Sequence, residues 1–200
     1  MKPKEPRAKR PPPPPKTESD KLAGRKWLTE EEVKQLISAA RQVGRLGDRD
    51  SAMILLAYRH GLRCTEVVHL QWDQIRLEVA SIEMRRAKRG RPAMHELTKL
   101  EIRALKKLQM GRRYRYVFTT EDGGRLGERS FHLIVQRAGK EAGFRFPVHP
   151  HMLRHACGHY LAGKGFDTRR IQDYLGHINI RHTVEYTELA PGRFAGFFED

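Results

Sequence analysis

The stretch HPHMLRHACGHYLAGKGFDTRRIQDYLGHINIRHTVEY, residues 149–186, decides the fold of this chain. Within it the segment HMLRH (151–155) opens one helix, and the segment LGH (175–177) closes another, because glycine is common just past the end of a helix. We expect helices over about Pro150–Gly163, Thr168–Leu175 and Ile180–Glu188. This part of the chain is therefore predicted to be entirely helical.

The residues upstream are also mostly helical. Thr29 is a good N-cap, Glu32 completes its capping box, and apolar residues then follow the 3.6-residue period as far as Gly44. Further helices are expected over about residues 50–61, 65–70, 99–109 and 130–142. The exception is the segment 80–97, where Ser81–Met84 and Ala93–Leu97 flank a basic turn and are typical of a hairpin. The expected fold class is mainly α with a small antiparallel β-sheet (α+β).

A chain of 200 residues is long enough for one domain and a short appendage. Residues 1–25 hold seven of the eleven prolines, and eight lysines or arginines against three acids. Repeated proline removes amide donors and favours an extended, solvated backbone. We expect a disordered basic arm over residues 1–25, with a proline-rich docking ligand as the alternative, and a single domain over residues 26–200.

The charge of the chain indicates its class of partner. Lysine and arginine number 39 against 24 aspartates and glutamates, so the formal net charge is +15. This favours nucleic acid as the partner, with an anionic membrane surface second. The sequence has neither the roughly 18–20 consecutive apolar residues of a membrane span nor an apolar N-terminal secretion signal. Its two cysteines, far apart, fit a reduced cytoplasm better than a disulfide framework.

Histidines cluster near the C-terminal end. His151, His155 and His159 are spaced i, i+4, i+8 on one predicted helix face, for which a zinc site is one interpretation. The three span about 12 Å at a rise of about 1.5 Å per residue, which is too far for one metal ion. No cysteine or carboxylate stands at a closing position nearby. We therefore expect no metal, and expect these histidines to pack or hydrogen-bond within the helix layer.

Residues that could act on a phosphate lie in four short motifs. The motifs are GLRCTE (61–66), KRGRP (88–92), HMLRH (151–155) and LGH (175–177) with a tyrosine nine residues beyond the histidine. The six candidate site residues are Arg63, Lys88, His151, Arg154, His177 and Tyr186. Each motif alone is weak, and a solvated hairpin tip is the alternative for Lys88. Together and in this order they resemble the active site of the tyrosine recombinases, the phage integrase family.

The resemblance covers about residues 27–198, and it is strongest to the short fimbrial phase-switch recombinases. The blocks that carry it are HPHMLRH (149–155), IQDYLGH (171–177), NIRHTV (179–184) and GRF (192–194). Like those proteins, the chain is expected to lack the N-terminal core-binding domain of most family members. In the wider family, segments after the nucleophile dock onto a neighbouring protomer. The resemblance implies this for Phe194, Phe197 and Phe198, with self-packing as the alternative.

The resemblance implies Tyr186 as the nucleophile, which would form a 3′-phosphotyrosyl link and release a 5′-hydroxyl. The guanidinium forks of Arg63 and Arg154 match the charge that gathers on the two non-bridging oxygens of the phosphate. His177 would donate a third hydrogen bond there. Lys88 is the expected proton donor to the departing 5′ oxygen.

Other residues have supporting roles in this interpretation. His151 resembles the acid/base histidine of the family and would assist proton transfer at the phenol. Glu66 is expected to hold the turn of the first arginine, with a plain helix-surface carboxylate as the alternative. Trp27 and Trp72 are expected to pack in the core or at a domain edge rather than stack on DNA bases, and Tyr174 is expected to lie in the core.

The resemblance implies a site-specific DNA recombinase that inverts, integrates or excises a segment. Its strand exchange is close to isoenergetic, and the sequence has no Walker A loop or clustered acidic triad, so we expect no cofactor. The expected partners are double-stranded DNA with paired recognition sites and DNA-bending accessory proteins. The protomers are expected to form a tetramer on two sites, at the nucleoid in a bacterial cytoplasm. A type IB topoisomerase and a non-catalytic DNA-binding regulator are the alternatives.

Overall fold

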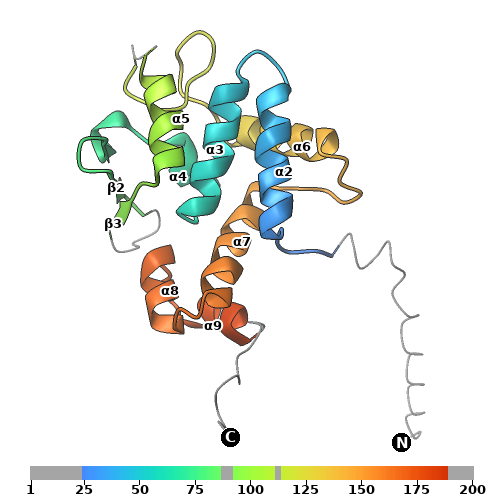
Figure 1. The fold of residues 1–200 in the computed structure, drawn as a ribbon, viewed down its shortest axis with the longest axis vertical. Helices are drawn as coiled ribbons and strands as arrows, with labels where there is room; N and C mark the ends of the chain where they lie inside the picture. The colour runs from blue at the N-terminus through green and yellow to red at the C-terminus, as the bar shows by residue number, and fades with distance from the viewer. Residues whose placement is uncertain (1–23, 87–91, 111–113, 189–200) are drawn as a thin grey trace, which may run out of the picture.

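The computed structural model describes residues 24–86, 92–110 and 114–188 (Figure 1). The described part is mainly helical with one small antiparallel sheet, which confirms the predicted fold class. Its helices are α2 (Glu30–Gln42), α3 (Gly47–Arg59), α4 (Cys64–Val68), α5 (Lys99–Gln109), α6 (Glu128–Glu141), α7 (Pro150–Gly163), α8 (Thr168–Leu175) and α9 (Arg181–Glu188). The remaining elements are the 3₁₀ turn η1 (Trp72–Gln74) and the strands β1 (Ile75–Arg76), β2 (Ser81–Met84) and β3 (Ala93–Glu96).

Local caps fix where several helices begin and end. The predicted capping box of α2 is present, because the Thr29 hydroxyl accepts from the Glu32 amide and the Glu32 carboxylate accepts from the Thr29 amide. Thr98 and Glu101 form the same motif at α5. α8 ends at Gly176, whose φ of 65° lies in the left-handed region that glycine adopts without strain. The observed starts of the other helices differ from the predicted ones by three residues or fewer.

The sheet has the strand order β1-β2-β3, with Ile82 of β2 opposite Ile75 of β1 and His95 of β3. The hairpin of β2 and β3 was predicted. β1 was not predicted, because two residues are too few to show an alternating pattern. The turn of the hairpin at residues 87–91, which includes Lys88, lies outside the described residues.

α3 forms the centre of the core. Every residue from Ala52 to Tyr58 is buried, and α2, α5 and α7 pack around this helix. Figure 1 shows α7 leaving this bundle towards α8 and α9, with which it also packs. Trp72 is buried, as predicted. The fold therefore brings the end of α3, the middle of α7 and the pair α8 and α9 to one region of the molecule.

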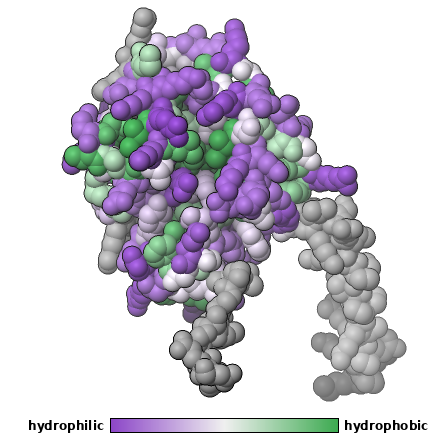
Figure 2. All heavy atoms as spheres, viewed as in Figure 1, coloured by the Kyte–Doolittle hydropathy of each residue, from purple (hydrophilic) through white to green (hydrophobic). Residues whose placement is uncertain are grey.

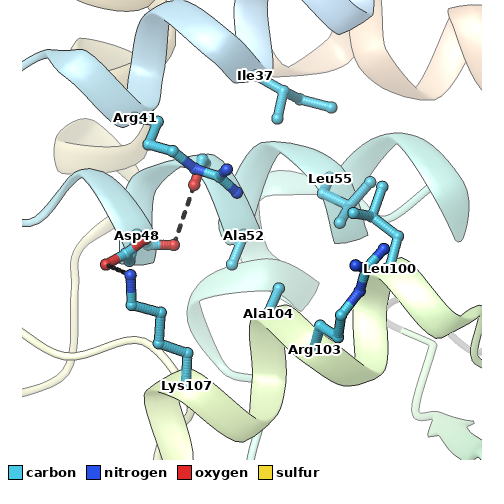
Figure 3. Close-up of a pocket in the computed structure, with 10 residues that line it drawn as sticks. Ile37, Arg41, Asp48, Ala52, Leu55, Leu100, Arg103, Ala104 and Lys107 are labelled. Atoms are coloured by element: carbon cyan, nitrogen blue, oxygen red, sulfur yellow. Dashed lines mark hydrogen bonds and ion pairs between the residues drawn. The ribbon is translucent and has the colours of Figure 1, made fainter.

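An apolar hollow of about 310 Å³ lies between α2, α3 and α5 (Figure 3). Ile37, Leu55 and Leu100 point into it, and at its rim the Lys107 ammonium lies 2.6 Å from an Asp48 carboxylate oxygen. Figure 2 shows a mostly hydrophilic surface on the same view, with hydrophobic residues gathered over α3 and α5. The hollow is lined by none of the five predicted site residues that the structure describes.

The expected arm over residues 1–25 lies outside the described residues, except for its last two. Of these, Arg25 makes two hydrogen bonds to the Glu32 carboxylate, of 2.7 and 2.6 Å, and places its guanidinium 4.5 Å from the Phe146 ring centroid. The apolar tip with Phe194, Phe197 and Phe198 is also outside the described part. No helix among the described residues is both long and apolar enough to cross a bilayer.

Candidate active site

Five of the six predicted site residues lie in the described part, and they come from four separate segments. Arg63 is the N-cap of α4, His151 and Arg154 lie on α7, His177 follows α8, and Tyr186 lies on α9. The charge of Arg63 acts on the pKa of each of the other four. The fold therefore brings together residues that are up to 123 positions apart in the chain.

Arg154 is the most deeply buried of these residues, with 2% of its surface exposed. Its guanidinium donates to the carbonyl oxygen of Gly61 and, at 2.9 Å, to that of Leu175. Burial lowers the pKa of Arg154 to about 10, and the neighbouring positive charge of Arg63 adds to this effect. Because carbonyl oxygens carry no formal charge, the positive charge of Arg154 is available to an anion.

Arg63 is held by the carboxylate of Glu66. The backbone N–H of Arg63 donates to Glu66 Oε2 at 3.0 Å, and the side-chain Nη1 of Arg63 donates to Glu66 Oε1 at 2.9 Å. Glu66 is 7% exposed, while the side chain of Arg63 keeps 28% of its surface exposed. The expectation that Glu66 fixes this turn is confirmed over the alternative of a surface carboxylate.

Tyr186 is 2% exposed, and its ring fits against α7. Its hydroxyl lies 3.1 Å from His155 Nδ1, and its ring centroid lies 5.0 Å from that of His159 and 6.3 Å from that of His177. Burial raises the pKa of Tyr186 to about 12, although Arg154 acts in the opposite direction. The phenol therefore needs a proton acceptor before it can attack at neutral pH.

His155 is the acceptor that the structure places at this phenol. Burial lowers the pKa of His155, so its ring is neutral at pH 7 and Nδ1 can accept the phenolic proton. His151 packs edge-on against His155, with ring centroids 4.5 Å apart. The sequence signal that could have identified His155 is its position four residues after His151, on the same helix face.

The expectation that His155 and His159 pack or hydrogen-bond within the helix layer is confirmed. His155 makes a hydrogen bond, and His159 stacks on Trp27 at a ring distance of 4.1 Å. In the described part of the chain, no three histidine, cysteine, aspartate or glutamate side chains are arranged to hold a metal ion.

His177 is oriented by its own neighbours. Its Nδ1 lies 2.8 Å from the hydroxyl of the buried Thr183, and its carbonyl oxygen accepts from Gln172 Nε2 at 2.9 Å. Burial lowers the pKa of His177 to about 3, with a further contribution from Arg154. When Thr183 donates to Nδ1, the ring proton lies on Nε2, and Nε2 can donate a hydrogen bond to an anion. A cavity of about 600 Å³ opens beside His177, next to Arg169 and the start of β3.

Tyr174 is the other tyrosine close to the site, and its contacts are structural. Its hydroxyl donates to the Arg59 carbonyl oxygen at 2.9 Å, and its ring stacks on His95 at 3.9 Å. Burial raises the pKa of its phenol well above the usual range. Tyr174 was expected in the core, but it is half-buried at the edge of the core because its hydroxyl reaches the Arg59 carbonyl oxygen there. Because its contacts are structural, Tyr186 is the stronger candidate for a nucleophile.

Comparison with known proteins identifies the family. The sequence model described as the phage integrase family matches residues 26–193. The chain belongs to the phage integrase family. Type 1 fimbriae regulatory protein FimE of Escherichia coli K12 is 43% identical over 185 residues, which cover 89% of this chain and 93% of FimE. FimB of the same strain is 40% identical, covering 88% and 90%, and tyrosine recombinase XerD of Listeria monocytogenes is 32% identical, covering 87% and 61%.

Solved structures of recombinases share the fold. XerA recombinase superposes with a TM-score of 0.73 at 27% identity, over 84% of this chain and 61% of XerA. A post-cleavage complex of XerH superposes with a TM-score of 0.74 at 22% identity, over 86% of this chain and 51% of XerH. At this identity the likeness to XerH is evidence for a shared fold only. The predicted family, the likeness to fimbrial recombinases and the class of site-specific tyrosine recombinase are therefore confirmed.

Proposed function

We propose that this recombinase cuts and rejoins double-stranded DNA through a covalent 3′-phosphotyrosyl link to Tyr186. The observation that carries the proposal is a buried phenol beside Arg154, Arg63 and His177, with a neutral histidine at its hydroxyl. These are the groups that phosphoryl transfer to a tyrosine requires: a nucleophile, a proton acceptor, and cations for the phosphate.

The two arginines bind the phosphate. Guanidinium forks suit the two non-bridging oxygens, on which charge gathers in the transition state. The burial that lowers the pKa of Arg154 makes its positive charge costly, and a bound phosphate anion would offset that cost. His177 donates a further hydrogen bond to the same oxygens through Nε2.

The chemical step forms one bond and breaks one. The phenolic oxygen of Tyr186 attacks phosphorus, and the phenolic proton passes to His155, which contacts the hydroxyl. His151, which packs against His155, is the proposed acid/base group that assists this transfer. The bond from phosphorus to the 5′ oxygen breaks, and that oxygen takes a proton from Lys88. The assignment of Lys88 rests on the family resemblance. Attack by a 5′-hydroxyl of another duplex reverses the step and joins new partners.

The known relatives support the choice of partners and outcome. A XerH neighbour is bound to its difH substrate, and a lambda integrase neighbour is a dimer on a COC′ core site. We propose paired recognition sites in duplex DNA as the substrate, a tetramer of protomers across two sites, DNA-bending accessory proteins, and action at the nucleoid in a bacterial cytoplasm. Inversion is the outcome that fits the likeness to FimE and FimB.

The test uses nicked suicide duplexes tiled across the DNA that flanks the gene for this chain. The cleaved strand carries a 5′ label, so a 3′-phosphotyrosyl link transfers the label to the protein. We expect wild-type protein to form a labelled adduct, and Tyr186→Phe to bind the same duplex with unchanged affinity and form none. An adduct that persists in Tyr186→Phe would refute the proposed nucleophile. Relaxation without rearrangement of a plasmid with two paired sites would favour a type IB topoisomerase instead.

A further inference from the structure

Arg86 lies two residues after the end of β2, and its side chain is completely buried. Its Nη1 donates to Glu66 Oε2 at 3.1 Å. Its Nη2 donates to the carbonyl oxygens of His60, at 3.2 Å, and Tyr174. The guanidinium therefore joins three segments that are distant in the sequence.

The stem of Arg86 is fixed as well as its head. A Cβ atom at Gly176 would lie 2.8 Å from Arg86 Cγ and 3.1 Å from its Cδ, which is closer than ordinary contact. The left-handed φ of Gly176 and this close approach both favour a residue without a side chain. Arg86 thus packs directly against the residue that precedes His177.

Arg86 and Arg154 hold the same two turns. Arg154 donates to the carbonyl oxygens of Gly61 and Leu175, and Arg86 donates to those of His60 and Tyr174, one residue earlier in each segment. The first turn leads into Arg63 and the second into His177. Arg86 and Arg154 therefore both link the turn before Arg63 to the turn before His177.

Glu66 connects Arg86 to Arg63 directly. Its Oε1 accepts from Arg63 Nη1, while its Oε2 accepts from the Arg63 amide and from Arg86 Nη1. Arg86 thereby holds the carboxylate that aims the Arg63 fork. Without Arg86, the carboxylate would lose the donor that holds Oε2 from the side of β2, and it could rotate together with Arg63.

We propose that Arg86 is a positioning residue of the recombination reaction, which fixes Arg63 through Glu66 and holds the turn before His177 in place. This inference rests on the proposed function, because it assumes that Arg63 and His177 bind the scissile phosphate. Arg86 does not touch the DNA in this scheme, since its side chain is fully enclosed. An arginine suits this position because Nη1 reaches Glu66 while Nη2 reaches the two carbonyl oxygens, whereas a lysine would have to reach all three acceptors from a single nitrogen atom.

Stability alone would not require a guanidinium at this position. Burying a charge is costly, and burial lowers the pKa of Arg86 although Glu66 acts in the opposite direction. Well-packed apolar side chains commonly replace buried ion pairs without loss of stability. A role in orienting Arg63 explains why a buried guanidinium is present at position 86, whereas packing alone does not.

The experiment compares Arg86→Met with a matched control, Arg85→Met. Arg85 is the adjacent residue, but its side chain is 47% exposed and binds Asp73 and Glu83 on the surface. Single-turnover cleavage is measured at saturating suicide duplex, and duplex affinity is measured separately. We expect Arg86→Met to cleave at least tenfold more slowly with an affinity within threefold of wild type. Arg85→Met should cleave at the wild-type rate.

Two further variants separate positioning from folding. Arg86→Lys keeps the charge, and we expect it to fold and still cleave at least tenfold more slowly, because one ammonium cannot replace the fork. Glu66→Gln combined with Arg86→Met should lose less than the product of the two single losses, because the two changes share the route through Arg63 even though Arg86 also holds the turn before His177. Multiplicative losses in the double variant, or wild-type cleavage by Arg86→Lys, would overturn the proposal. A wild-type protein that forms no Tyr186-dependent adduct would instead refute the proposed function.

Discussion

Gly158 on α7 leaves the space in which the Tyr186 ring lies. A Cβ atom at Gly158 would lie 2.5 Å from Tyr186 Cδ2 and 2.7 Å from its Cζ, whereas ordinary contact begins at 3.4 Å. The substitution Gly158→Ala therefore requires the ring to move by about 1 Å, since 3.4 − 2.5 = 0.9 Å. This perturbation acts on the proposed nucleophile without altering any polar group.

The magnitude follows from two opposing effects. Forcing an extra methyl group into a packed site costs about 1–3 kcal/mol. Alanine in a helix interior is favoured over glycine by up to about 1 kcal/mol. We expect a net loss of about 1 kcal/mol in the free energy of unfolding, and a fall of about 2–4 °C in Tm. Because an error of about 1 Å in a reacting group can cost about 100-fold in rate, the loss of cleavage should be far larger than the loss of stability.

The assay pairs urea unfolding with single-turnover cleavage of the suicide duplex. Gly163→Ala is the control, because it lies on the same helix and a Cβ there meets nothing within 4 Å. A second control is Gly158→Ala in the Tyr186→Ala background. There the clash is absent, so the alanine should stabilise the protein by up to about 1 kcal/mol. If Gly158→Ala is as stable as Gly163→Ala and cleaves at the wild-type rate, the close packing of Tyr186 on α7 is not the state that reacts.

Four further predictions concern protons and charge. Burial lowers the pKa of both His95 and His177 to about 3, so the unfolded chain protonates them below about pH 6.5 while the folded protein does not. Stability should therefore fall as pH drops from about 6.5 towards 3, by up to about 1.4 kcal/mol per pH unit for each group, with a shallower slope in His95→Gln by urea unfolding. His155→Ala should slow cleavage by about 100-fold with unchanged duplex affinity, since the phenol loses its acceptor, while the exposed His132→Ala should cleave normally. Duplex affinity should fall at least about tenfold between 50 and 200 mM salt, and a flat salt response would contradict a complex held by phosphate contacts. Deleting residues 1–25 should weaken duplex binding without abolishing cleavage.

The sequence predicted those features that depend on nearby residues. The capping box of Thr29 and Glu32 and the glycine at 176 act within one helical turn, so their signals lie within a few positions of the helix ends. The order of the four phosphate motifs was also sufficient to indicate the family, which the match over residues 26–193 confirms. The hairpin was visible for the same reason, whereas the two-residue β1 was not.

The tertiary structure alone decided which groups from distant segments contact one another in the site. Arg86 reaches main-chain carbonyls 26 and 88 positions away, and a carbonyl is present at every residue, so no residue type at its partner positions marks the contact. The spacing from His151 marks His155 as a residue on the same helix face, but its pairing with the Tyr186 hydroxyl depends on how α9 packs on α7. Helix caps and motif order could therefore be predicted from the sequence. The contacts between side chains of distant segments were set only by the way those segments pack together.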